Sequence, residues 1–111
     1  MSAEVLSAAR LRIDLDALAK NYRLLRERAA PGECAAVVKA DAYGLGVAPV
    51  VRRLIREGCR RFFVATLAEA AELRALAADA AIYVLEGAVP AAVDKLVALR
   101  ATPVLNSLEQ V

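Results

Sequence analysis

The sequence predicts an α/β fold in which helices cover a parallel sheet. After an N-terminal strand and helix, short apolar runs alternate with amphipathic stretches in the order β-α-β-α-β-α-β, and the start of a further helix follows. The apolar runs lack the polar alternation of half-buried strands, as is typical of strands buried in a parallel sheet. Apolar runs separated by helices therefore indicate parallel strands joined by helical crossovers.

Each element is predicted by its own local pattern. Alternating apolar and polar side chains in residues 11–15 indicate a half-buried strand, and apolar spacings of three and four residues indicate helices. The segment TLAE at 66–69 has the form of a capping box, which begins a helix. In order, the expected elements are a strand at 11–15, a helix at 15–29 that ends at Pro31-Gly32, a fully buried strand at 34–38, a helix at 47–54 with its exit at Gly58, a strand at 62–65, a helix from 67, a strand at 82–85, a helix from Pro90, a strand at 102–105, and a helix start capped by Asn106 or Ser107.

Two architectures satisfy this order, an open doubly wound sheet and a (β/α)8 barrel. Four core strands are half of what a barrel needs, and barrels typically take about 250 residues. The sequence has 111 residues and ends on a helix start. We therefore expect an α/β chain that is the first half of a (β/α)8 TIM-type barrel, apparently truncated.

Composition excludes several classes of function. The net charge is +2, the basic residues are scattered and aromatic residues make up 5% of the chain, which argues against nucleic-acid binding. The sequence has no histidine and only two cysteines, so it predicts neither a His/Cys metal site nor a His-based triad. Isolated cysteines, no signal-peptide core in residues 1–12 and no apolar run of about 18 residues predict a cytoplasmic protein without a membrane partner.

Lys39 is the strongest candidate for chemistry. It follows the apolar run at 34–38, and a charged lysine is costly to bury there, whereas a neutral or imine-forming amine is useful. In a barrel, the active site lies at the C-terminal ends of the strands. Lys39 and Tyr43 are thus placed to hold an aldehyde cofactor and one oxygen of its phosphate. The alternative is a lysine that reaches solvent along its apolar stem, with Tyr43 covering the core.

The glycines at 44 and 46 do not form a nucleotide-binding signature. No Lys-Ser or Lys-Thr pair follows them, and Pro49 stands where G-x-G-x-x-G requires its last glycine. We interpret this segment as a tight turn into the helix at 47–54.

The carboxylates give no acid–base pair. Asp41 is expected to be a solvated loop residue, with pairing to Lys39 or capping of the turn as alternatives. The pattern places three further carboxylates on helix or loop surfaces, which gives no support to a glycosidase-like site: Glu69, Glu72 and Glu86.

The segment AVVKADAYG at residues 36–44 closely resembles the pyridoxal-phosphate lysine motif of the alanine racemase family. This motif is specific, and other segments that resemble the family in the expected order support it. They cover nearly the whole chain: IDLDAL at 13–18 with Asn21-Tyr22, FVAT at 63–66 with Glu69-Ala70, VLEG at 84–87, and TPVLNSLEQ at 102–110. The resemblance implies that residues 1–111 are the N-terminal portion of the family's barrel domain, with its C-terminal β domain absent.

The resemblance also implies a chemistry. Lys39 would bind pyridoxal 5'-phosphate covalently and then, as a neutral amine, act as the base on one face of the α-carbon of alanine. Tyr43 would hydrogen-bond the cofactor phosphate, and Leu85 would line the ring pocket. The implied reaction interconverts L- and D-alanine, which supplies D-alanine for peptidoglycan, and the implied assembly is a head-to-tail homodimer.

The sequence departs from the family in two respects. Leu45 stands where many relatives carry histidine, and the second base, a tyrosine from the partner subunit, belongs to a region beyond residue 111. We therefore expect the 111-residue chain to be inactive alone. A pyridoxal-phosphate barrel protein without racemase activity and a non-enzymatic doubly wound domain remain alternatives. Alanine and serine racemases share this segment, so it does not separate the two substrates.

Overall fold

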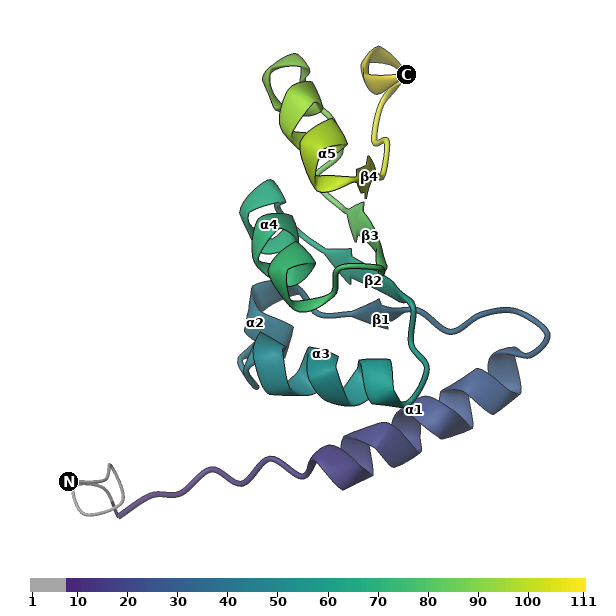
Figure 1. Cartoon of the computed structure of the whole chain (residues 1–111), viewed down its shortest axis with the longest axis vertical. Helices are drawn as coiled ribbons and strands as arrows, with labels where there is room; N and C mark the ends of the chain where they lie inside the picture. The colour runs from purple at the N-terminus through teal and green to yellow at the C-terminus, as the bar shows by residue number, and fades with distance from the viewer. Residues whose placement is uncertain (1–7) are drawn as a thin grey trace.

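A four-stranded parallel sheet forms the centre of the computed structural model, which describes residues 8–111 (Figure 1). Each strand pairs with the next one along the chain, so the sheet order is β1-β2-β3-β4. In this register Phe62 lies between Ala36 and Ile82. The strands are β1 (Ala36–Val37), β2 (Arg61–Val64), β3 (Ala81–Val84) and β4 (Ala101–Pro103).

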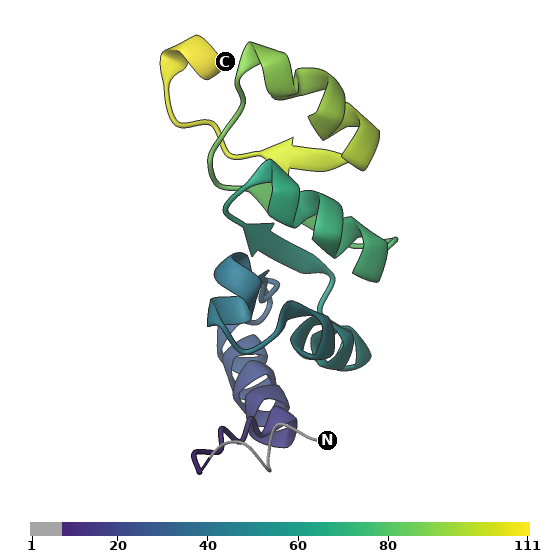
Figure 2. The ribbon, with the colours of Figure 1, turned by 90° about the vertical axis from the view of Figure 1, so that its left-hand side faces the viewer.

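The helices of the crossovers lie on one face of this sheet, as Figures 1 and 2 show. They are α3 (Val47–Arg56), α4 (Leu67–Leu76) and α5 (Val93–Leu99), the last preceded by a 3-10 turn, η2 (Pro90–Ala92). A doubly wound sheet reverses its strand order at a switch point and carries helices on both faces. The sequential order and one-sided cover are instead those of a barrel wall.

The core lies between the sheet and these helices. Every second residue of β2 and β3 points into it, because successive side chains of a strand face opposite sides. Its largest fully buried side chains are Phe62, Leu73, Ile82, Val51, Val64 and Val84. The capping box predicted at 66–69 is present at the start of α4.

The other face of the sheet is open. Phe63 and Tyr83 stack there with ring centroids 4.6 Å apart, and Val37 is 44% exposed. The prediction of a fully buried strand at 34–38 is thus wrong in extent and burial, because the second face of the sheet has no helical cover. The radius of gyration, 16.2 Å, exceeds the roughly 13 Å of a compact chain of this length, as an open wall requires.

Before the sheet, the chain forms α1 (Leu15–Ala29), which ends as predicted ahead of Pro31. The strand predicted at 11–15 is not formed. Leu11 is 79% exposed, and the alternating segment has no strand beside it with which to form a ladder.

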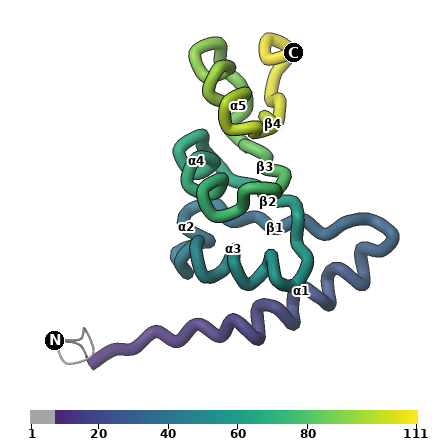
Figure 3. Tube along the Cα trace, in the orientation of Figure 1, coloured from purple at the N-terminus to yellow at the C-terminus, as the bar shows by residue number. Residues whose placement is uncertain are grey.

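Residues 1–7, part of the segment that lacks a signal-peptide core, lie outside the described residues. The chain path places residues 8–14 and the C-terminus at opposite ends of the described structure (Figure 3).

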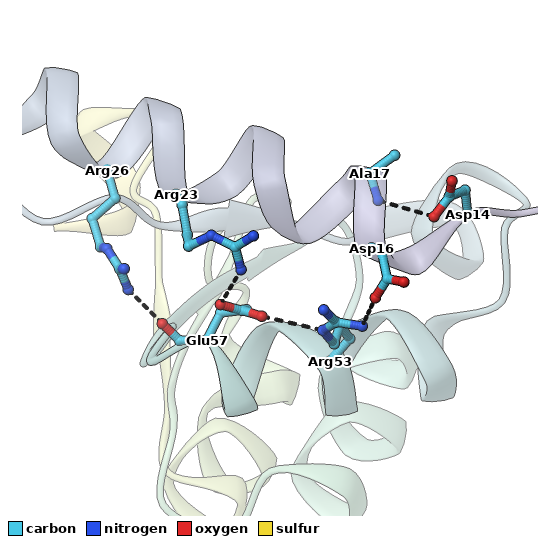
Figure 4. A network of polar contacts seen from close by, with 7 residues as sticks. All are labelled: Asp14, Asp16, Ala17, Arg23, Arg26, Arg53 and Glu57. Carbon is cyan, nitrogen blue, oxygen red and sulfur yellow. Dashed lines mark hydrogen bonds and ion pairs between the residues drawn. The ribbon is translucent and has the colours of Figure 1, made fainter.

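A polar network fastens α1 to α3 (Figure 4). The Glu57 carboxylate accepts hydrogen bonds from Arg23 at 2.7 Å and from Arg53 at 3.2 Å. Arg53 also reaches Asp16 at 2.6 Å, and Arg26 donates to the Glu57 carbonyl. Because α1 buries only one stripe, with Leu25 58% exposed, these polar contacts add to the apolar packing that holds α1 against α3.

The described chain contains no helix long and apolar enough to cross a membrane.

The predicted helix after residue 106 is a single 3-10 turn, η3 (Leu108–Gln110), preceded by Ser107.

Candidate functional site

Lys39 lies directly at the C-terminal end of β1. The preceding residue, Val38, is 3% exposed, and its N–H donates to the Phe63 carbonyl at 2.9 Å, which continues the ladder up to the lysine. Lys39 itself is half-buried. Within residues 8–111, no hydrogen bond or ion pair engages its amine. The structure therefore places Lys39 directly after a paired strand residue and, within residues 8–111, leaves its amine without a protein partner.

The residues after Lys39 form a left-handed turn. The short helix α2 (Lys39–Tyr43) has φ angles between 52° and 58° from Ala40 to Tyr43, four successive non-glycine residues. A left-handed conformation costs roughly 1–2 kcal/mol per such residue. Hydrogen bonds from Ala42 N–H to Val38 and from Gly44 N–H to Ala40 close the turn at 3.0 and 2.8 Å. Sequence reasoning expected an ordinary tight turn at the glycines and missed this conformation, since only glycine normally signals it.

Tyr43 lies on the same turn as Lys39, and 63% of it is exposed. Tyr43 also lines a depression together with the core residues Val38 and Leu54, so its position is compatible with both the cofactor role and the alternative in which it covers the core. Lys39 and Tyr43 therefore present an amine and a phenol from one short segment at the strand end.

Asp41 is exposed to solvent, as predicted, and its side chain also closes the loop that follows. Its Oδ1 accepts from the Val47 N–H at 2.8 Å, and its carbonyl accepts from the Gly46 N–H at 2.9 Å. The alternative in which Asp41 caps the turn is thus correct, and within residues 8–111 its carboxylate forms no ion pair with Lys39. Leu45, at the position of the family histidine, packs partly buried against the core.

Glu69 connects two loops at this edge. Its Oε1 accepts from the N–H groups of Ala65 at 2.7 Å and Thr66 at 3.2 Å, and its Oε2 accepts from the Ala40 N–H at 2.7 Å. Sequence reasoning found the capping box but placed Glu69 on the surface. The contact with Ala40 was missed because it joins residues 29 positions apart, which no local pattern reveals.

The loops after β3 and β4 are tied together in the same way. The Asn106 side chain donates to the Leu85 carbonyl at 3.0 Å, while Glu86 accepts from the Leu67 N–H at 2.9 Å. Leu85 is half-buried at the end of its strand. Both Glu69 and Glu86 are engaged by backbone N–H groups and do not form an acid–base pair. No group of side chains in residues 8–111 is suited to hold a metal ion.

Comparisons with known proteins agree with this arrangement. Residues 13–111 match the family model for the alanine racemase N-terminal domain. An alanine racemase of Methylobacterium nodulans is 50% identical over 111 residues, all of this chain and 30% of that protein. A catabolic alanine racemase of Rhizobium johnstonii is 54% identical over 101 residues, 90% of this chain and 27% of that protein.

A solved structure confirms the predicted fold class. The crystal structure of alanine racemase from Bartonella henselae with covalently bound pyridoxal phosphate superposes with a TM-score of 0.84 at 41% identity. It covers 88% of this chain, which corresponds to 28% of that one. The chain thus spans less than a third of the length of the relatives it matches, and it belongs to the alanine racemase N-terminal domain family.

Proposed function

We propose that this chain supplies the cofactor lysine and one catalytic base of a pyridoxal-phosphate-dependent alanine racemase. The observation that carries the proposal is the Lys39 amine, half-buried at the end of β1 and without a partner in residues 8–111. The donor set fits the group, since an amine binds an aldehyde and an exposed phenol binds a phosphate oxygen. Tyr43 is therefore the proposed phosphate ligand, with Leu85 beside the ring.

When bound, pyridoxal phosphate supplies the electron sink that makes the α-proton of an amino acid removable. Lys39 Nζ would hold the cofactor and, as a neutral amine, would move a proton at one face of the α-carbon. Tyr43 Oη would donate a hydrogen bond to the phosphate and so orient the cofactor. Backbone hydrogen bonds between Val38 and Gly44 place the Lys39 and Tyr43 side chains on one closed turn.

Racemization requires proton transfer on both faces of the α-carbon, and Lys39 serves one of them. We propose that the second base comes from a tyrosine of a partner subunit in a head-to-tail homodimer, as the family resemblance implies. The chain contributes the first four strands of the barrel and the three helices that connect them in this proposal. Its free cysteines, Cys34 and Cys59, are typical of a reducing compartment, so we place the protein in the cytoplasm.

Borohydride reduction in the presence of pyridoxal phosphate, followed by peptide mapping, tests the cofactor lysine. The label is expected on the peptide that contains Lys39, and Lys39→Ala is expected to remove it. Lys20, exposed on α1, provides the matched control, since Lys20→Ala should leave the labelling unchanged. Equal labelling of all lysines would refute the assignment.

Activity is tested in a chimera in which residues 1–111 replace the matching segment of the Methylobacterium nodulans racemase. We expect racemization of L-alanine, followed by polarimetry, and a loss of about 100-fold or more in the Lys39→Ala chimera. A chimera that binds the cofactor at Lys39 without racemizing alanine would support a binding protein instead.

A further inference from the structure

Glu69 joins the two loops that surround the lysine end of β1. One carboxylate oxygen receives the Ala65 and Thr66 N–H groups, and the other receives the N–H of Ala40, the residue next to Lys39. We propose that Glu69 is a positioning residue, whose carboxylate holds the left-handed turn in the conformation that presents Lys39 to its cofactor. This inference rests on the proposed function of Lys39.

The contact with Ala40 goes beyond helix capping. In a capping box, the Thr66 side chain accepts from the Glu69 N–H, here at 3.1 Å, while the glutamate side chain returns to the Thr66 N–H. That exchange occupies one carboxylate oxygen. The 2.7 Å bond to Ala40 uses the other oxygen and fastens a different loop.

The Ala40 N–H has no acceptor within its own turn, and the Glu69 carboxylate supplies one. The first N–H groups of any helical turn lack a carbonyl partner within the turn, and α2 is too short to supply one. Four successive residues with positive φ are intrinsically unfavourable, so the turn persists only where its surroundings hold it. Glu69 is the side chain that accepts a hydrogen bond from the Ala40 N–H, at the first left-handed residue after the lysine.

The charge of Glu69 is required because all three contacts are N–H donors. A carboxylate only accepts hydrogen bonds, with both oxygens, whereas a glutamine would turn an NH2 group towards one of the donors. Because Oε1 serves two donors and Oε2 serves one, the amide oxygen of Glu69→Gln should stay with Ala65 and Thr66, and its NH2 group should face Ala40, whose N–H then loses its acceptor. Hydrogen bonds to charged groups are also stronger than neutral ones.

The test compares four variants of the full 111-residue chain. Glu69→Gln breaks the bridge, which is the carboxylate link between Ala40 on one loop and Ala65 and Thr66 on the other. Glu69→Asp keeps the charge, but its side chain is one methylene shorter and should not reach both loops. Thr66→Val removes the cap hydroxyl and leaves the bridge intact. Glu72→Gln, on the exposed side of the same helix, is the matched control.

Two quantities are measured in each variant, with circular dichroism to check helix content. They are the amide exchange rate of Ala40 by NMR and the rate of covalent attachment of pyridoxal phosphate to Lys39, trapped with borohydride. For Glu69→Gln and Glu69→Asp we expect exchange about tenfold faster and slower attachment. Thr66→Val and Glu72→Gln should retain the wild-type exchange and attachment rates.

Wild-type exchange and attachment in both Glu69 variants would overturn the inference. It would also fail if Thr66→Val slowed attachment as much as Glu69→Gln, because the role would then be that of a cap. If Glu69→Gln loses its helices, Glu69→Asp decides by the same criteria. Absence of label on Lys39 in the wild-type chain refutes the proposed function instead, whatever the Glu69 variants show.

Discussion

Asp41 and Val47 are joined by a hydrogen bond of 2.8 Å from the backbone N–H to the carboxylate Oδ1. Val47 is the first residue of α3, and the position before it is Gly46, which has no side chain to cap the helix. The acceptor for the helix N-terminus therefore comes from five residues before Gly46, across the glycine turn. The same residue that follows the lysine in the left-handed turn thus anchors the next helix.

Asp41→Ala should destabilise the chain by about 1 kcal/mol, because the Val47 N–H loses the acceptor that serves it as a cap. Asp41→Asn retains an oxygen at the same place and should cost a few tenths of that amount. Urea unfolding followed by circular dichroism measures both. Equal stability of the alanine and asparagine variants would show that the contact contributes nothing.

The Glu57 network should make stability depend on pH. Hydrogen bonds from Arg23, and then from Arg53, hold the pKa of the Glu57 carboxyl below its usual 4.5. A lowered folded-state pKa stabilises the native state above the unfolded pKa, and the contribution is lost as pH falls through the folded value. Glu57→Gln should therefore lower Tm at neutral pH.

Thermal unfolding between about pH 7 and pH 3 checks this prediction. The difference in Tm between wild type and Glu57→Gln should shrink as the pH falls, since protonation removes the same charge from the wild-type carboxyl. The exposed Glu72→Gln variant should follow the wild-type curve throughout. A Tm difference for Glu57→Gln that stays constant with pH would contradict an ionic origin.

Gly87, just after β3, should not tolerate a side chain. Its φ is +87°, and a Cβ atom there would stand 2.4 Å from the Gln110 Oε1. Gly87→Ala should therefore destabilise the chain by more than about 1 kcal/mol, from backbone strain and collision together. Adding Gln110→Ala should recover only the part due to the collision with Gln110, because the Cβ atom would still stand 2.9 Å from the Asn106 Nδ2. Urea unfolding of the single and double variants measures this part; full recovery would mean that neither backbone strain nor Asn106 opposes the side chain.

Much of the fold was predictable because it follows from local patterns. The apolar spacing at residues 47–54 and the capping box at 66–69 each depend on neighbours a few residues apart, and both elements form as predicted. Residues 11–15 show the limit of this reasoning. Their alternating pattern is that of a strand, but a strand also requires a partner, which local sequence does not reveal.

The site was predictable in position but not in detail. Lys39 falls at a strand end, as the pattern of apolar residues indicated, and Tyr43 lies on the turn that follows. The left-handed conformation and the bond from Ala40 to Glu69 are set by contacts between distant loops. Because alanine and tyrosine rarely adopt positive φ, residue types alone argue against the conformation that these contacts stabilise.

Arg74 connects two loops at the N-terminal ends of the strands, the end of the sheet opposite to Lys39. Its guanidinium donates five hydrogen bonds of 2.7 to 3.1 Å to carbonyls of the α4–β3 and α5–β4 connections, namely those of Ala77, Ala78, Ala80, Leu99 and Arg100. These carbonyls belong to helix ends and loops, where no regular backbone partner exists. Arg74 therefore replaces backbone hydrogen bonds at two neighbouring connections at once.

Arg74→Met keeps the apolar stem and removes every donor, and it should destabilise the chain by about 2 kcal/mol, as expected for loss of a charge-assisted contact. Arg56→Met, at an exposed site on α3, is the matched control and should stay within about 0.5 kcal/mol of wild type. Urea unfolding measures both, and equal losses in the two variants would contradict the prediction. Because Arg74 bonds the connections away from Lys39, its loss should leave the rate of cofactor attachment unchanged in the folded chain.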